Sequence, residues 1–192
     1  RSCGGDRVEH ILDLGSQAWC NDFLLAENLG NEKTYPLRLV YCIECELSQL
    51  DYTVPKETMF KDHTYVSGTT KSLAKHFLQI AEKNKQYLDK DDLILDIGGN
   101  DGTQLLQYKK LGYNNLLNIE SANNIAELSV KNNIPTINDF FNEKLVDSIG
   151  IKAKLISASG VFFHLEELHS VIRGIKKALD TNGIFVVQFM YF

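Results

Sequence analysis

The sequence predicts an α/β fold with a parallel sheet, preceded by a small zinc-ribbon-like domain. Short apolar runs alternate with helical segments from residue 91 onward, which is typical of a parallel sheet covered by helices. The first sixty or so residues differ, because they hold all four cysteines and the single tryptophan. We expect a zinc-binding domain at 1–62, an active-site segment and connecting helix at 63–90, and an α/β domain at 91–192.

Charge and hydropathy narrow the classes of function. The chain carries 25 acidic and 20 basic residues, and the basic ones form no stripe, which argues against nucleic acid as a partner. No apolar run is long enough to span a bilayer, so we expect no membrane contact. The composition is that of a cytoplasmic protein, in which cysteines favour a metal over disulfides. We also expect a monomer.

The cysteine spacing points to one tetrahedral metal ion. Cys42-Ile43-Glu44-Cys45 is a C-x-x-C knuckle, and Cys3 resembles the second half of another knuckle whose partner would precede Arg1. Structural Zn²⁺ on Cys3, Cys42, Cys45 and a missing cysteine is the favoured interpretation. Cys20 as the fourth ligand and a set of reduced core cysteines are the alternatives. Strand-like runs at 8–14, 37–41 and 46–54 suit a zinc-ribbon-like hairpin.

The connecting segment and the α/β domain follow in order. Residues 62–70 are rich in turn formers, and Thr69 or Thr70 is the expected N-cap of a helix over 71–88. Beyond it we expect strands at 93–97, 115–119, 134–137, 154–158 and 184–189, and helices at 103–111, 121–132 and 166–179. Because the fifth strand would leave an open apolar edge, we expect the chain to be a fragment of a longer protein.

The first strand of this sheet runs into a glycine-rich turn. The turn reads Asp96-Ile97-Gly98-Gly99-Asn100-Asp101-Gly102-Thr103 and lacks the G-x-G-x-x-G spacing of a dinucleotide site. An acid two residues before the first glycine instead resembles the D/E-x-G-x-G-x-G motif of class I S-adenosylmethionine (SAM) methyltransferases. Asn100 takes the place of the middle glycine. The alternative is a tight strand–helix turn that binds nothing.

Other polar residues follow the later strands, where a doubly wound sheet binds its ligand. Glu120 ends the second strand, and its carboxylate can accept both ribose hydroxyls of an adenosine, whether from NAD or SAM. Asp139 with Phe140 and Phe141 could bind adenine, although at least one of these rings is expected in the core. His164 follows the fourth strand as a possible base or donor, and by itself it is more simply a structural residue.

Taken together, these segments resemble the sugar C-methyltransferases that act on nucleotide-linked deoxysugars and carry an N-terminal zinc-binding domain. The matching segments are Arg1-Ser2-Cys3-Gly4, Asp13-Leu14-Gly15-Ser16-Gln17, Tyr35-Pro36-Leu37, Cys42-Ile43-Glu44-Cys45, Gln49-Leu50, Tyr65-x-Ser67 with His76, the Asp96–Thr103 turn, Glu120-Ser121, Asp139-Phe140-Phe141 and His164. They occur in family order over nearly the whole chain.

The resemblance implies a class I Rossmann-like fold, truncated here after the fifth strand, with SAM as methyl donor. It implies methylation of a nucleotide-diphospho 4-keto deoxysugar at the carbon next to the ketone, commonly C-3. The implied catalytic residues are Tyr65 and His164. The implied cofactor-binding residues are Asp96, Gly98, Gly99, Asn100, Asp101, Gly102, Thr103, Glu120, Ser121, Asp139, Phe140, Phe141 and Ser159.

Some features depart from the family. Gly160 stands where the family often has Asn, and His63 replaces a frequent aromatic residue. The family's best candidate base, a Glu-His pair, lies beyond Phe192, so we expect these 192 residues to be inactive alone. The competing functions are O-methylation of another small molecule and a non-catalytic module that binds zinc and a nucleotide. An NAD enzyme is the weakest, because of the glycine spacing.

Overall fold

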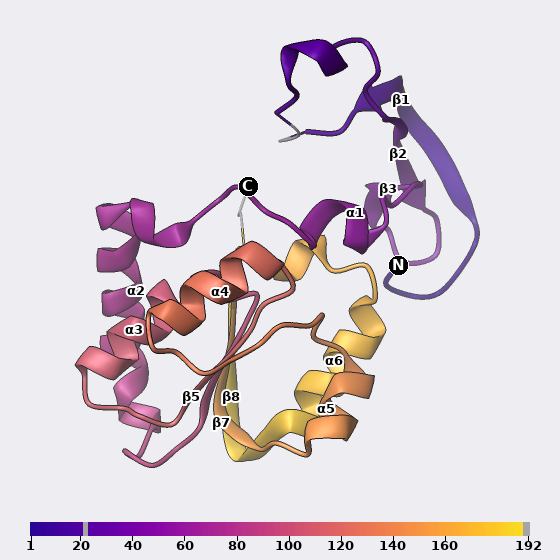
Figure 1. Cartoon of the computed structure of the whole chain (residues 1–192). Helices are drawn as coiled ribbons and strands as arrows, with labels where there is room; N and C mark the ends of the chain where they lie inside the picture. The colour runs from indigo at the N-terminus through magenta and orange to yellow at the C-terminus, as the bar shows by residue number, and fades with distance from the viewer. Residues whose placement is uncertain (21–22, 190–192) are drawn as a thin grey trace. The chain divides into compact units, whose positions relative to one another are not determined.

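A computed structural model describes residues 1–20 and 23–189 of the chain (Figure 1). The chain divides into two compact units, Arg1–Thr58 and Met59–Phe192. Each unit has its own sheet, one antiparallel and one parallel.

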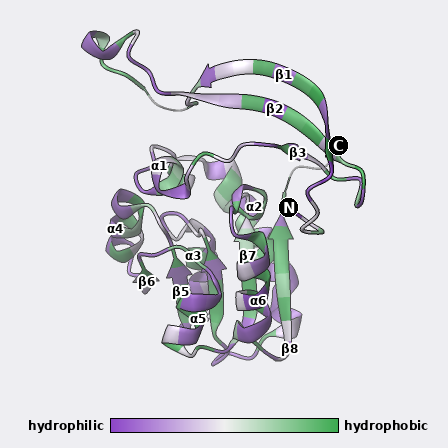
Figure 2. Ribbon diagram, turned by 90° about the vertical axis from the view of Figure 1, so that its right-hand side faces the viewer, coloured by the Kyte–Doolittle hydropathy of each residue, from purple (hydrophilic) through white to green (hydrophobic). Residues whose placement is uncertain are grey.

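The N-terminal unit is built on a three-stranded antiparallel sheet in the order β1-β2-β3. Its strands are β1 (Val8–Ala18), β2 (Thr34–Cys42) and β3 (Ser48–Leu50). Figure 2 shows β1 and β2 as a long curved ribbon. β1 runs beyond the expected 8–14, because it pairs along the whole of β2, from Val8 opposite Cys42 to Ala18 opposite Thr34. The cysteine knuckle lies between β2 and β3, as the hairpin prediction requires.

The second unit contains a five-stranded parallel sheet in the order β6-β5-β4-β7-β8. This confirms the predicted α/β class with a parallel sheet. Chain order reverses between β4 and β7, which makes the carboxyl end of β4 the topological switch point. The strands are β4 (Ile94–Ile97), β5 (Leu116–Ile119), β6 (Thr136–Ile137), β7 (Ala153–Ser159) and β8 (Leu179–Gln188). The longer helices are α2 (Lys71–Asn84), α3 (Thr103–Lys110), α4 (Asn123–Lys131), α5 (Glu143–Ile149) and α6 (Leu168–Ala178), and α1 (Lys56–Phe60) is short.

Helices cover both faces of this sheet, with α2 and α3 on one side and α5 and α6 on the other (Figure 1). Successive side chains of β4 point to opposite faces of the sheet, so this strand contributes to the core on each side. Ile94 packs in the cluster that contains Ala81 of α2 and Leu105 of α3. Leu95 and Ile97 pack in the cluster on the α5 and α6 side. Asp96 has the parity of Ile94, so its side chain leaves the strand toward the α2 and α3 side.

In the second unit, three elements differ most from the sequence prediction. The helix expected over 71–88 ends at Asn84 and continues as a 3-10 turn, Lys85–Tyr87. The third strand shortens to Thr136–Ile137. β8 begins at Leu179 rather than residue 184, because Leu179 already pairs with Ala153 and the Asn182 turn is absorbed as an irregularity within the strand.

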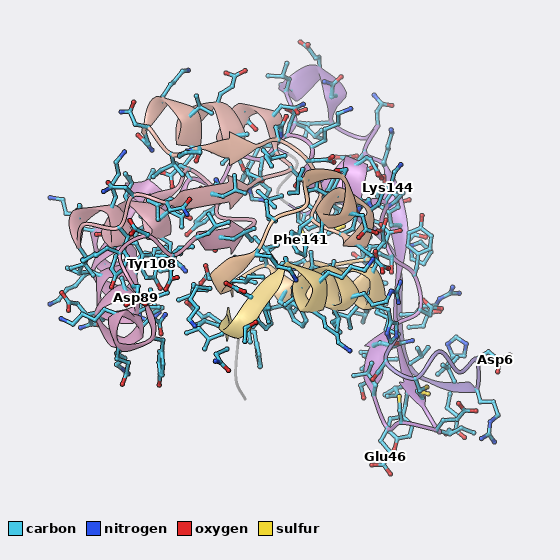
Figure 3. The ribbon with its side chains drawn as sticks, turned by 90° about the horizontal axis from the view of Figure 1, so that it is seen from below. Asp6, Glu46, Asp89, Tyr108, Phe141 and Lys144 are labelled. Atoms are coloured by element: carbon cyan, nitrogen blue, oxygen red, sulfur yellow. The ribbon has the colours of Figure 1, made fainter. Side chains whose placement is uncertain are left out.

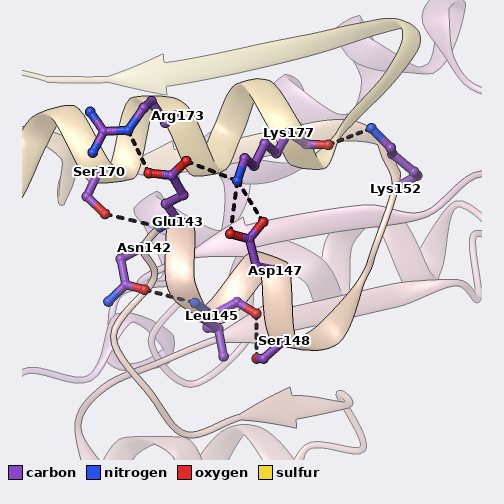
Figure 4. Close-up of polar contacts among 9 residues, drawn as sticks. All are labelled: Asn142, Glu143, Leu145, Asp147, Ser148, Lys152, Ser170, Arg173 and Lys177. Carbon is purple, nitrogen blue, oxygen red and sulfur yellow. Dashed lines mark hydrogen bonds and ion pairs between the residues drawn. The ribbon is translucent and has the colours of Figure 1, made fainter.

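The prediction omitted α5, although its ends carry clear signals. Asn142 caps its N-terminus by accepting a hydrogen bond from Leu145 N at 2.9 Å, and Gly150 ends it in the left-handed conformation. Seven residues are too few for a visible period. The helix is held instead by α6 and by surface ion pairs in which Lys177 contacts Glu143 at 3.0 Å and Asp147 at 2.8 Å (Figure 4).

Candidate functional site

Three left-handed residues shape the turn after β4. Gly98 has φ +61°, Asn100 +52° and Gly102 +81°. A Cβ on Gly98 would lie 2.8 Å from Val161, and one on Gly102 would lie 2.9 Å from Ile134. Both glycines are therefore required by conformation and by packing. The turn leads directly into α3, so its backbone N–H groups meet at a helix N-terminus at the switch point.

Asp96 lies beneath this turn rather than on its surface. Its side chain is buried, with 1% of the residue exposed, and Oδ1 accepts a hydrogen bond from Ser157 Oγ at 2.7 Å. Oδ2 would be 2.8 Å from a Cβ on Gly99, so the carboxyl group supports the turn from inside. The pKa of Asp96 is raised to about 7. Burial is the largest cause, the charge of Glu120 adds to it, and the Ser157 hydrogen bond opposes both.

Glu120 is anchored to the same turn from the end of β5. Its Oε2 accepts from Asn100 N at 2.9 Å and its Oε1 accepts from Ala122 N at 2.8 Å. Burial raises the pKa of Glu120, and the backbone N–H groups of Ala122, Asn100 and Ser121 together with the charge of His63 oppose this shift. An ionised carboxylate has about four acceptor positions, and the bonds from Asn100 N and Ala122 N use two of them. The others suit a pair of vicinal hydroxyls.

Several of the remaining predicted cofactor residues make hydrogen bonds within the chain. Asp101 and Thr103 bond to each other, with Thr103 Oγ1 donating to Asp101 Oδ1 at 2.6 Å. Gly99 N donates to the side chain of Asn118 at 3.1 Å. Ser121 Oγ donates to Phe60 O at 3.4 Å, close to the turn region.

The aromatic pair after β6 divides between core and surface. Phe141 is buried in the core on the α5 and α6 side (labelled in Figure 3), which confirms that at least one of the two rings is a core residue. Phe140 is half-buried and Asp139 is exposed, with Asp139 Oδ1 accepting from Phe140 N at 2.7 Å. Binding of adenine by Asp139 and Phe140 stays a prediction.

A cluster of rings gathers around Phe60. The Phe60 ring centroid lies 6.4 Å from that of His63 and 5.9 Å from that of His164, and His63 meets Tyr65 edge-on at 6.4 Å. Burial and the charge of His63 both lower the pKa of His164. Tyr65 is half exposed. The structure thus brings Tyr65 and His164 into one neighbourhood, through Phe60 and His63.

Sequence reasoning missed several residues of this site. Ser157 holds Asp96, Asn118 supports the turn, and His63 was noted only as a departure from a family pattern. Gln104 accepts from Ser159 Oγ at 2.7 Å, and its Nε2 is buried without a partner among the described residues. The only signal for Ser157 and Asn118 is that they lie in strands adjacent to β4, and the sequence does not show which strands are adjacent.

The N-terminal unit holds a separate cysteine cluster. The sulfurs of Cys3, Cys42 and Cys45 lie within 4.8 Å of one another, and Cys3 and Cys42 are 3.6 Å apart. Backbone N–H groups of Cys45 and Glu44 lower the pKa of Cys42 to about 7, which favours the thiolate form that binds metal. Cys20 is exposed and is not part of this cluster. Three converging sulfurs fit a tetrahedral Zn²⁺ whose fourth position they leave open.

Among the described residues, no helix combines the length and apolar character that crossing a membrane requires.

Comparisons with known proteins agree with the fold and with the cysteine cluster. The parallel sheet with its covering helices has counterparts among solved structures. It is matched by the crystal structure of DesVI from Streptomyces venezuelae, with a TM-score of 0.51 and 20% identity over 65% of this chain and 54% of that one. A "putative s-adenosyl-l-methionine-dependent methyltransferase" of Methanococcus maripaludis matches with a TM-score of 0.51 and 18% identity, over 66% of this chain and 64% of that one.

Sequence comparison gives more specific relatives than the comparison of folds. Residues 1–60 match the Methyltransf_13 family model, described as "Putative zinc binding domain". The chain is 25% identical over 197 residues to C-methyltransferase NovU of Streptomyces niveus, a match that covers 100% of this chain and 47% of that protein. These two matches confirm the resemblance drawn from the motifs. The chain spans about half the length of this curated relative.

Proposed function

We propose that this chain is part of a SAM-dependent C-methyltransferase that acts on a nucleotide-linked 4-keto deoxysugar, at the carbon next to the ketone. The observation that carries the proposal is the glycine turn at the switch point with Glu120 anchored on its backbone. The full-chain similarity to a C-methyltransferase supports the reaction type. The sugar, the nucleotide and C-3 rest on the family resemblance of the motifs.

The residues divide the work of cofactor binding. The backbone of Gly98–Gly102 would bind the amino-acid part of SAM, and Glu120 would accept its ribose hydroxyls through the two acceptor positions left free. Phe140 and Asp139 would meet the adenine. Asp96 and Ser157 would hold the turn in shape from below. Bound in this way, SAM supplies a methyl group on a positively charged sulfur.

The proposed reaction needs a carbanion next to a ketone. The ketone makes the neighbouring C–H acidic, a base takes the proton, and the enolate oxygen is stabilised by hydrogen-bond donors. Tyr65 and His164 are the candidate donors, because both lie in the ring cluster around Phe60. The lowered pKa of His164 keeps its imidazole neutral near pH 7, so it can donate or accept a proton. Positioning of the two reactants would supply much of the acceleration.

The cysteine cluster would have a structural role. Cys3, Cys42 and Cys45 would bind Zn²⁺ as thiolates, and the ion would stabilise a unit whose long β1 is exposed along its whole length. Cysteines that would bind a metal rather than form disulfides also support a cytoplasmic location. We also propose that a fourth ligand outside this cluster completes the zinc site, and that the protein is a monomer.

Calorimetric titration of this chain with S-adenosylhomocysteine (SAH) tests the cofactor site. We expect saturable binding that Glu120→Gln weakens about tenfold or more, since a hydrogen-bonded charge contributes about 1.5–3 kcal/mol. Glu127→Gln, an exposed glutamate on α4, is the matched control and should leave affinity unchanged. Absence of binding by the folded chain, or equal loss in both variants, would contradict the assignment of the site.

Product analysis tests the reaction type in the full-length protein. With deuterium at the carbon next to the ketone, C-methylation must release the label, because that C–H bond breaks. Retention of the label in a methylated product would identify an O-methyltransferase instead.

A further inference from the structure

Asn100 is unusual among the residues of the glycine turn, because all of its polar groups are engaged. Its backbone N donates to Glu120 Oε2 at 2.9 Å, and its carbonyl accepts from Asn118 Nδ2 at 2.9 Å. Its side chain reaches away from both. Oδ1 accepts from Ser67 N at 2.8 Å, and Nδ2 donates to Tyr65 O at 3.0 Å.

The left-handed conformation of Asn100 does not require an asparagine side chain. At φ +52° a glycine would be unstrained, whereas asparagine only tolerates the left-handed region. The two side-chain hydrogen bonds both go to residues 65–68, which we call the strap. Asn100 therefore does something that the glycine of the usual motif could not do.

The next residue of the turn makes a parallel contact. Asp101 Oδ2 accepts from Gly68 N at 3.1 Å, so two successive side chains of the turn bind two successive N–H groups of the strap. The approach is close, because a Cβ on Gly68 would lie 2.4 Å from Asp101 Oδ2. The strap is thus fitted onto the turn at Ser67 and Gly68, and Tyr65 stands at its start.

We propose that Asn100 is a positioning residue that fastens the strap to the cofactor turn, so that occupation of the turn and the placement of Tyr65 are coupled. This inference rests on the proposed function. Glu120 accepts a hydrogen bond from Asn100 N, so a ligand bound to Glu120 would also restrain the backbone of Asn100. The side chain of Asn100 in turn holds the strap. The substrate-facing tyrosine would therefore be ordered most firmly when the methyl donor is bound.

Amide hydrogen exchange of the chain, followed by NMR with and without SAH, tests this coupling. In the wild type we expect the Ser67 and Gly68 amides to be protected, and SAH to slow their exchange further. In Asn100→Gly we expect the Ser67 amide to exchange about tenfold faster, as loss of one hydrogen bond allows. Wild type and variant are both compared at saturating SAH, so a change in affinity does not enter the comparison.

Two further variants distinguish loss of the contact between strap and turn from a general loss of order in the segment around the strap. Gly68→Ala disturbs the contact from the strap side, because the added Cβ would lie 2.4 Å from Asp101 Oδ2. Both Asn100→Gly and Gly68→Ala should abolish the effect of SAH on Ser67. Asn124→Ala is the matched control, because Asn124 holds His63, two residues before the strap, by two hydrogen bonds at 3.1 and 2.7 Å. Among the described residues, its side chain has no hydrogen bond to the turn. Asn124→Ala should speed exchange near His63 and leave the effect of SAH on Ser67 intact.

The outcomes are distinct. Unchanged exchange of Ser67 in Asn100→Gly would overturn the fastening. An undiminished effect of SAH on Ser67 in both Asn100→Gly and Gly68→Ala would overturn the coupling. If the wild-type chain binds no SAH, the proposed function and the coupling fall together. The comparison of ligand-free Asn100→Gly with wild type then still decides whether Asn100 fastens the strap.

Discussion

Asp96 should make the second unit less stable as the pH rises from about 4 to 7. Burial raises its pKa in the folded chain from 3.8 to about 7. Between these two values the folded state keeps a proton that the unfolded state has released. The unfolded state therefore binds fewer protons, and the free energy of unfolding falls with rising pH, by about 1.4 kcal/mol per unit for one full proton. Over the whole window the shift corresponds to at most about 4 kcal/mol.

Replacement of Asp96 by Asn removes this titration and nearly preserves the shape. Ser157 can still donate to the retained oxygen, whereas the new amide N–H group is buried beneath Gly99 and adds a penalty that does not vary with pH. We therefore expect Asp96→Asn to have a flatter stability curve between pH 4 and 7. Its stability relative to wild type should rise across this window by a few kcal/mol.

Urea unfolding at half-unit pH intervals, followed by circular dichroism, measures the difference between the two curves. Asp91→Asn, at an exposed aspartate just before β4, is the control and should not change the slope. A stability difference between Asp96→Asn and wild type that is the same at pH 4 and pH 7 would refute the reasoning. It would mean that Asp96 titrates like an ordinary exposed carboxylate.

Three further perturbations test other parts of the structure. Gly102→Ala should lower stability by roughly 2–4 kcal/mol in chemical unfolding, because strain and overlap add, whereas Gly150→Ala, left-handed but in open space, should lower it by about 1 kcal/mol. Cys42→Ser should abolish stoichiometric zinc in elemental analysis while Cys20→Ser retains it, and equal zinc in both would contradict the proposed ligands. Lys177→Ala should lower stability only slightly, an effect that vanishes in 1 M salt, since its ion pairs are half exposed.

Local features of the sequence determined the class of fold and the location of the ligand edge. Apolar runs alternating with helices specify a parallel sheet, and residues that end such strands gather at one edge whatever the strand order. The conformations of Gly98, Asn100 and Gly102 are a property of the turn itself. The C-x-x-C spacing of Cys42 and Cys45 likewise needs no knowledge of distant residues to indicate a metal.

Only the tertiary structure decided which residues support that edge. Ser157 reaches Asp96 because β7 lies beside β4, and no pattern in the sequence states that order. Asn100 meets the strap because residues 33 to 35 positions earlier return to the turn. Such contacts join segments far apart in the chain, so their hydrogen-bond partners are specified by packing rather than by local spacing. For the same reason α5 could not be predicted from the sequence. It is too short to show a helical period, and its contacts with α6 are seen only in the tertiary structure.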